Sequence, residues 1–487
     1  MHTNTSDQRF PPAPGAGPSR KQFKVGTLTY TVSGLAVLFF WLLWGDFCFT
    51  LMEVVWQSIL PLHIKALNAP NWVIGAMMTS IPQILNMTLN PVISTKSDSF
   101  RSQWGRRRPF MLVATPFIAL FLCLVGFTPE MGRFLFTIGL GKVTGWSVGA
   151  ITVGVIAVMI AGFRIAELFV ATLFYYFLND VVPQLVMARF LALFRVVGTL
   201  AGALYSFFFY QHALTHMRLI FVCAGLLYFV GFMMMCWRVK EGEYPPPSPV
   251  PDKDRGFLGM IRVYVRDCFG QKLFIILYLQ TMVGALTYGC AVFGVFLNIS
   301  LGLNLQQLGS INAMVNVFST LLIYPAGMLA DRFHPMRLIV LAKFAGAILI
   351  PLQFVWLFTH YSPSVNYMIL LVLNMLTLPL NLIVAASIMP LYMRLFPREQ
   401  FGKYCSCIAM CGALVGIFSG ILAGLFIDNM RKVFPDAQFG KDFCFRLIPA
   451  WNLFFMSVEI ILLALFYKEW RRLGGVSYVP HAVEGNS

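Results

Sequence analysis

The sequence is poor in charged residues. Asp, Glu, Lys and Arg together make up 11% of its 487 residues, whereas 58% are hydrophobic. A typical soluble domain carries about 25% charged residues, and the mean hydropathy of this chain is +0.74. The shortage of charge excludes a soluble globular protein and predicts a protein that crosses a membrane several times.

Histidine and catalytic motifs are also scarce. None of the seven histidines falls at the centre of a long apolar run, so proton transfer inside the membrane would have to use carboxyl groups. The chain contains no HExxH, no GxSxG and no nucleotide-binding P-loop, which argues against an intramembrane enzyme and an ATP-driven pump. Cys405, Cys407 and Cys411 lie among Ala, Met, Ile and Gly, where thiols act as small hydrophobic groups. We expect no enzymatic activity, no cofactor and no metal.

The basic residues fall in short clusters between apolar runs. The net charge is +16, but no single soluble face carries it, so we predict a lipid bilayer and no nucleic acid as partner. If both termini are cytoplasmic, about 25 of the 36 Lys and Arg residues lie on the cytoplasmic side. The first 28 residues contain no apolar h-region, so no cleavable signal peptide is expected. The predicted location is the plasma (cytoplasmic) membrane.

Long apolar windows predict twelve membrane-spanning helices. They lie near residues 31–60, 72–94, 110–127, 147–178, 190–210, 218–237, 273–299, 309–329, 338–358, 366–392, 404–427 and 449–467. The predicted fold class is an all-α polytopic membrane protein with two pseudo-symmetric six-helix bundles. The predicted segments are a disordered cytoplasmic tail (1–30), the first bundle (31–238), a Pro-rich cytoplasmic linker (239–272), the second bundle (273–468) and a cytoplasmic C-terminal tail (469–487).

The two halves repeat each other. The residues Pro183, Arg189, Gly198 and Gly202 recur 214 positions later as Pro397, Lys403, Gly412 and Gly416. Parallel repeats of six spans are typical of a large class of transporters. The second copy continues as a stripe of glycines, Gly412, Gly416, Gly420 and Gly424, which predicts that another helix packs closely against the eleventh span.

Two charged loops carry a family resemblance. Ser97–Phe110 reads SDSFRSQWGRRRPF and Gly327–Arg337 reads GMLADRFHPMR. They resemble the signature loops of the major facilitator superfamily, and the first is similar to its form in sucrose–proton and glycoside–pentoside–hexuronide cation symporters. The segment NDVVP, which ends at Pro183, resembles another loop of those branches. The helix after Arg189 lacks the Gly-Pro pair of the antiporter branch, which favours symport.

The resemblance implies a cytoplasmic gate and a monomer. In the superfamily the acid of each signature loop pairs with a neighbouring helix end, and nearby bases support it. The gate residues predicted here are Asp98, Arg106, Arg107, Arg108, Asp180, Arg189, Asp331, Arg332 and Arg337. For the arginine triplet, membrane topology and binding of anionic lipid remain alternatives to a gating role.

Ionisable residues inside the predicted spans are candidates for proton coupling. Asp46 and Glu53 are seven residues apart, which places both carboxylates on one side of the first span. Arg164 and Glu167 lie one turn apart in the fourth span, and either pair within that helix or let Arg164 reach Asp46 or Glu53 across a cavity. Glu459 is a further candidate in the last span. By contrast, the basic residues Arg195 and Lys343 are expected to extend toward the cytoplasmic surface.

Amides and aromatic side chains within the spans could bind a sugar, because amides bond hydroxyl groups and rings cover the C–H face. The predicted substrate-binding residues are Trp44, Trp56, Gln57, Gln83, Asn86, Gln280, Tyr288, Asn316, Asn374, Asn381 and Asn452. These residues could also serve only to bond neighbouring helices or to lie at the membrane interface.

The hypothesis from sequence is a secondary active transporter that works by alternating access and cotransports a sugar or glycoside with a proton. Sodium remains an alternative coupling ion, because carboxylates and amides bind both cations. Alternative functions are transport or export of another small organic solute, such as an organic acid or a drug-like or peptide-like molecule. A sensor that keeps this fold without transporting is disfavoured, because buried acids are costly.

Overall fold

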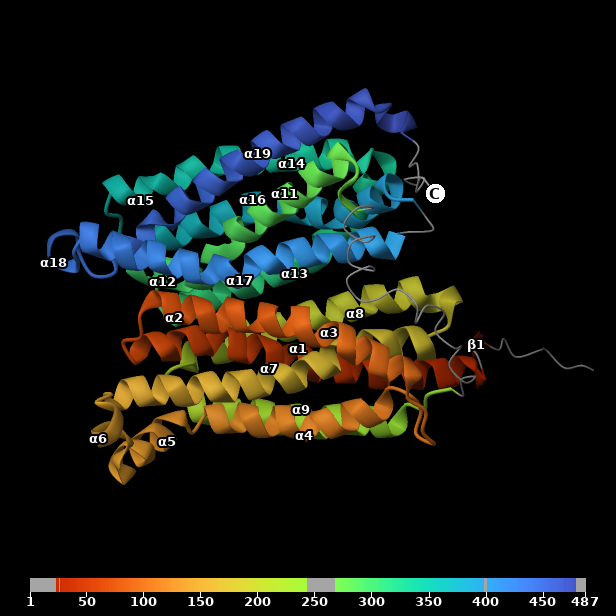
Figure 1. Ribbon diagram of the computed structural model, residues 1–487, viewed down its shortest axis with the longest axis horizontal. Helices are drawn as coiled ribbons and strands as arrows, with labels where there is room; N and C mark the ends of the chain where they lie inside the picture. The colour runs from red at the N-terminus through yellow and green to blue at the C-terminus, as the bar shows by residue number, and fades with distance from the viewer. Residues whose placement is uncertain (1–22, 26, 243–267, 398–400, 479–487) are drawn as a thin grey trace, which may run out of the picture.

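The computed structural model describes residues 23–25, 27–242, 268–397 and 401–478. Most of the predicted linker, residues 243–267, and much of both predicted tails therefore lie outside the described residues. Within the described part, the chain forms two helical bundles that lie side by side along their length (Figure 1).

The first bundle consists of the helices before the linker. It contains α1 (Val32–Ala66), α2 (Asn71–Gly75), η1 (Ala76–Ser80), α3 (Ile81–Ser99), α4 (Arg108–Val125), α5 (Thr128–Leu135), η2 (Phe136–Leu140), α6 (Gly141–Thr144), α7 (Val148–Val181), α8 (Gln184–Leu204), η3 (Tyr205–Phe209), η4 (Tyr210–His212) and α9 (Met217–Arg238).

The second bundle repeats this arrangement. It contains α11 (Lys272–Thr287), η5 (Tyr288–Phe293), α12 (Gly294–Ser300), α13 (Leu305–Arg332), α14 (Pro335–Leu349), η6 (Ile350–Phe354), α15 (Val355–Phe358), α16 (Pro363–Leu395), α17 (Phe401–Val433), α18 (Asp436–Phe439), η8 (Phe443–Leu447), α19 (Ile448–Arg472) and η9 (Gly475–Ser477). The short π and 3-10 segments mostly continue a neighbouring α-helix without ending it.

Eleven helical runs among the described residues are long and apolar enough to cross a membrane. The predicted second span is the twelfth run, and it is helical from Asn71 to Ser99 through α2, η1 and α3. It is more polar than the others because Gln83, Asn86 and Asn90 lie along α3. The all-α polytopic fold is thereby confirmed, and the polar helix is one that faces the other bundle.

The two ends of the molecule differ. Strand β1 (Phe23–Val25) and the C-terminal end of α19 lie at one end of Figure 1, and α6 and α18 lie at the opposite end. We call these ends the terminus side and the far side. Positive charge in the sequence predicts that the terminus side is cytoplasmic.

Part of the predicted disordered N-terminal tail is ordered. Phe23–Val25 pairs with β2 (Leu28–Tyr30) in an antiparallel hairpin, with Phe23 opposite Tyr30 and Val25 opposite Leu28. The two triplets alternate apolar and polar residues, which is the pattern of a strand with one covered face. The prediction for residues 23–25 and 28–30 was therefore wrong.

Candidate transport site

The two bundles meet through glycines on the far side. A Cβ added to Gly75, the last residue of α2, would lie 1.9 Å from the backbone oxygen of Gly420 in α17. A Cβ added to Gly424 of α17 would lie 2.4 Å from Cα of Trp72 in α2. A second contact between the bundles joins α13 to η3, where a Cβ added to Gly309 of α13 would lie 2.2 Å from the backbone oxygen of Ser206. The predicted close approach to the glycine stripe of α17 is confirmed, and it closes the far side of the interface.

An acid group lies in the first bundle where α1 faces α7. The guanidinium of Arg164 is 3.1 Å from Glu167 and 3.6 Å from Glu53. Gln57 donates a hydrogen bond of 2.6 Å to Oε2 of Glu53, and the guanidinium lies 5.0 Å from the ring centre of Trp56. Both alternatives for Arg164 therefore hold together: it pairs within its helix and also across to α1.

The carboxylate excess is a central property of this group. Glu53 and Glu167 share one cation, and Oε1 of Glu53 is buried without a hydrogen-bond partner. A low-dielectric environment favours a neutral or fully paired arrangement of charges. One further monovalent cation would therefore balance the group.

A cavity of 420 Å³ opens beside this group. Its wall on α7 includes Arg164 and Glu167, and its wall on α3 includes Gln83 and Asn86. Sequence reasoning missed four further polar lining residues, which are Asn90, Thr172, Tyr175 and Tyr176. Most of them follow the helical period that starts at Gln83 or Arg164, so that period was the signal that could have identified them.

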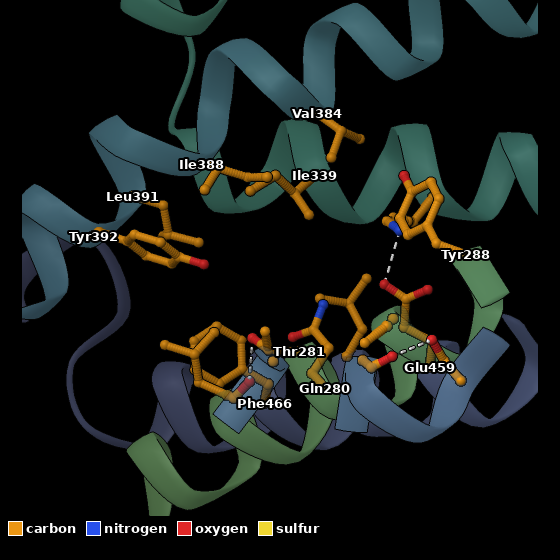
Figure 2. Close-up of a pocket in the computed structure, with 18 of the residues that line it drawn as sticks. Gln280, Thr281, Tyr288, Ile339, Val384, Ile388, Leu391, Tyr392, Glu459 and Phe466 are labelled. Atoms are coloured by element: carbon orange, nitrogen blue, oxygen red, sulfur yellow. Dashed lines mark hydrogen bonds and ion pairs between the residues drawn. The ribbon is translucent and has the colours of Figure 1, made fainter. Parts of the chain in front are cut away.

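A second cavity of 440 Å³ lies mainly in the second bundle. Figure 2 shows apolar side chains of α16, among them Val384 and Ile388, on one wall, facing Gln280 and Glu459 on the other. Gln83 of α3 lines this cavity as well as the first one. The side chain of Gln83 thus lies between the two candidate binding regions.

Lys343 is part of the second cavity, which corrects the expectation that it extends to the membrane surface. Its ammonium is 2.7 Å from Oε1 of Glu459, and the two side chains are 15% and 6% exposed. The pairing keeps the ammonium inside, because a buried carboxylate offers a stronger partner than distant water. Oε2 of Glu459 and Oε1 of Gln280 are buried acceptors without a hydrogen-bond partner.

Asp46 is buried but lies apart from the Arg164 group. Its Oδ1 accepts a hydrogen bond of 3.4 Å from Thr50, its Oδ2 has no partner, and it lies opposite Gly198 of α8. Sequence reasoning placed Asp46 and Glu53 on one side of α1. The two carboxylates nevertheless have different partners: Asp46 lies against Gly198 of α8, whereas Glu53 pairs with Arg164 of α7.

Several predicted substrate-binding residues have other surroundings. Trp44 lies against Gly231 of α9, and Asn316 lies against Gly202 across the bundle interface. Asn374 donates to the carbonyl of Leu370 in its own helix. Tyr288 lines the second cavity, whereas neither described cavity includes Asn381 or Asn452.

The terminus-side arginines bind within the first bundle. Arg106 and Arg107 contact Asp180 at the end of α7 at 2.8 and 2.6 Å, and Arg108 donates to the carbonyl of Cys236 in α9 at 2.9 Å. Glu241 accepts from the backbone N–H groups of Arg107 and Arg108. These contacts fasten α4 to α7 and α9, so here the triplet joins helices of one bundle.

The remaining predicted gate residues lie on the terminus side. Arg189, Arg332 and Arg337 are exposed on the terminus side. Asp98 and Asp331 lie at the ends of α3 and α13, and their side chains lie outside what the structure describes. Their gating role stays a prediction.

The chain is similar to membrane transporters in sequence as well as in fold. A profile of the MFS/sugar transport protein family matches residues 44–401, more than half of the chain. The chain therefore belongs to this family.

Solved transporters share the fold at low sequence identity. The nucleoside transporter NupG aligns with a TM-score of 0.63 and 14% identity, covering 89% of this chain and 99% of that one. A bacterial homolog of the human lysosomal transporter Spinster, inward-facing and occupied, aligns at 0.61 and 12% identity, covering 90% and 97%. A D-xylose–proton symporter aligns at 0.56 and 12% identity, covering 86% and 96%.

Proposed function

We propose that this protein cotransports a sugar or glycoside with a proton by alternating access. The observation that carries the proposal is the group Glu53, Arg164 and Glu167, in which two carboxylates share one guanidinium at the wall of a cavity among the membrane-spanning helices. A structural ion pair would need only one acid.

The excess acid supplies the coupling. A proton on Glu53 or Glu167 leaves a neutral ion pair with Arg164, whereas loss of the proton leaves one unbalanced negative charge. Because Arg164 also lines the cavity with Glu167, a change in its pairing alters the polar groups that a solute meets. Proton binding and solute binding are thereby linked through one side chain.

The second cavity favours a hydroxylated solute with an apolar part. Gln280 and Glu459 each present a buried oxygen without a donor, which a hydroxyl group of a sugar can supply. Val384 and Ile388 on the opposite wall suit an apolar face or aglycone (Figure 2). A glycoside meets both requirements in one molecule.

The closed far side supports an assignment of the stage of the proposed cycle. Glycine contacts seal the interface there, and the lining of the second cavity extends to Ile339, Tyr392 and Phe466, toward the terminus-side ends of α14, α16 and α19. With a cytoplasmic terminus side, this is a state open or opening to the cytoplasm. Rocking of the bundles would expose the same side chains to the far side.

Uptake by purified protein in proteoliposomes tests the proposal. A panel of free sugars, alkyl and aryl glycosides and hexuronides is offered under a pH gradient, a Na⁺ gradient or neither. We expect accumulation of a glycoside under the pH gradient alone. Accumulation under the Na⁺ gradient alone would replace the proton by Na⁺, and no gradient-driven uptake of any panel member would contradict the proposal.

A further inference from the structure

Asp428, near the far-side end of α17, bonds to the other bundle. Its Oδ1 accepts hydrogen bonds from the side-chain amide of Asn71 at 2.7 Å and from the backbone N–H of Asn71 at 3.2 Å. Its Oδ2 accepts from the backbone N–H of Trp72 at 3.1 Å. One carboxylate of the second bundle therefore holds three donors of the first.

Lys65 extends the same contact. It lies at the end of α1 and donates a hydrogen bond of 3.0 Å to Oδ1 of Asn71, which orients the amide of Asn71 toward Asp428. Its ammonium lies 4.8 Å from the ring centre of Phe445 and 5.8 Å from that of Phe296, both in the second bundle. Cation–π attraction to these rings adds a second bond between the bundles.

These polar contacts lie on the far side of the glycine contacts between α2 and α17. Asn71 and Trp72 precede Gly75 by one turn, and Asp428 follows Gly424 by one turn. The backbones of α2 and α17 are in contact at the glycines, so the helices cannot separate on the far side while the Asp428 bonds hold. Asp428 and Lys65 are only partly buried, so water can replace their partners after separation.

We propose that Asp428, Asn71 and Lys65 form the far-side gate of the transporter. When their bonds break, the bundles can separate and the transporter can open to the far side. The carboxylate sets the strength of the gate because charged acceptors form stronger hydrogen bonds than neutral ones. This inference rests on the proposed alternating access and does not depend on which solute or ion is carried.

Cysteine labelling measures gate opening without any solute. Thr79 lines the second cavity. A Cβ added to Gly420 would lie 2.7 Å from Cβ of Thr79, so the glycine contacts between α17 and the first bundle shield a thiol at position 79 from the far side. A membrane-impermeant maleimide is added from the far side to the full chain carrying Thr79→Cys. The rate of labelling is measured after subtraction of the labelling of the parent protein, which keeps Thr79. We expect Asp428→Asn to increase the rate about tenfold, since about 1.4 kcal/mol, roughly one charge-assisted hydrogen bond, changes an equilibrium tenfold.

Asp436 provides the matched control. It is a far-side carboxylate that pairs with Arg431 at 3.1 Å and accepts from the N–H of Asp442, all within the second bundle. Asp436→Asn should leave the labelling rate of Cys at position 79 unchanged. Equal rates in the Asp428→Asn and Asp436→Asn proteins would overturn the proposal.

A pair exchange separates gating from general loosening of the fold. Asn71→Asp alone places two carboxylates together and should label rapidly. Combined with Asp428→Asn, it restores one amide–carboxylate pair in reversed order, and labelling should return toward the parent rate. If the combined variant labels as fast as the faster single variant, Asn71 and Asp428 do not form the gate.

Discussion

Removal of the Arg164 side chain should destabilise the protein through the acids it leaves behind. In Arg164→Met, Glu53 and Glu167 lose the cation that lies 3.6 and 3.1 Å from them, and their side chains are only 18% and 6% exposed. Breaking a buried ion pair by removing one partner costs about 3–5 kcal/mol. The adjoining cavity lets water reach the site, so we expect the lower end, about 3 kcal/mol.

Thermal unfolding in detergent at neutral pH measures this cost. Arg164→Met should unfold several degrees below the parent, and a second change, Glu53→Gln, should recover part of the difference because it removes one of the two acids left without a cation. Arg133→Met is a control, since Arg133 is an exposed arginine of α5. An Arg164→Met protein as stable as the parent, or no recovery in the double variant, would refute the shared-cation account.

Three further changes test other parts of the structure. Gly424→Ala should destabilise the far-side contact by about 1–3 kcal/mol in thermal unfolding, because its Cβ meets backbone. Gly402→Ala, where a Cβ meets nothing within 4 Å, should not destabilise the protein, because alanine favours a helix over glycine. Asp180→Asn should cost about 3 kcal/mol, since it removes the carboxylate that two arginines contact, and an unchanged unfolding temperature would contradict this. Burial and two nearby arginines lower the pKa of His334, so its contribution to stability is lost as pH falls below about 6.5. His334 caps α14 by accepting the N–H of Met336 at Nδ1. His334→Asn keeps a side-chain acceptor for this cap and should show a smaller loss of stability between pH 7.5 and 5.5.

The sequence predicted the bundles because long apolar windows report the thickness of the membrane directly. It also predicted close packing at the glycine stripe, because glycines spaced four residues apart leave one face of the helix without side chains. It could not identify the partner of that stripe. Gly420 meets Gly75 only because the two bundles dock, and docking of separate bundles leaves no local pattern in the chain.

Charged residues were harder to place than apolar ones. The pairing of Arg164 with Glu167 follows from helical spacing, but the added contact to Glu53 depends on how α1 packs against α7. Lys343 was predicted to extend to the surface from its position in the span, and a carboxylate more than one hundred positions later holds it inside. Long-range ion pairs of this kind depend on tertiary packing, which hydropathy does not record.

The far-side gate was missed for the same reason. Asp428 follows an apolar run directly, where a carboxylate is usually a solvated end of a span. Its partners Asn71 and Trp72 lie about 356 positions earlier in the chain. No motif joins them, so only the docked bundles show that the three residues meet.

Solute-driven proton movement in proteoliposomes tests the central claim most directly. Once a transported glycoside is identified, the parent and the Glu53→Gln and Glu167→Gln variants are compared for proton uptake on addition of that solute and for solute counterflow without a gradient. The account predicts that at least one variant loses solute-driven proton uptake while it keeps counterflow. Proton uptake at the parent level in both variants would contradict the assignment of coupling to the acids that share Arg164.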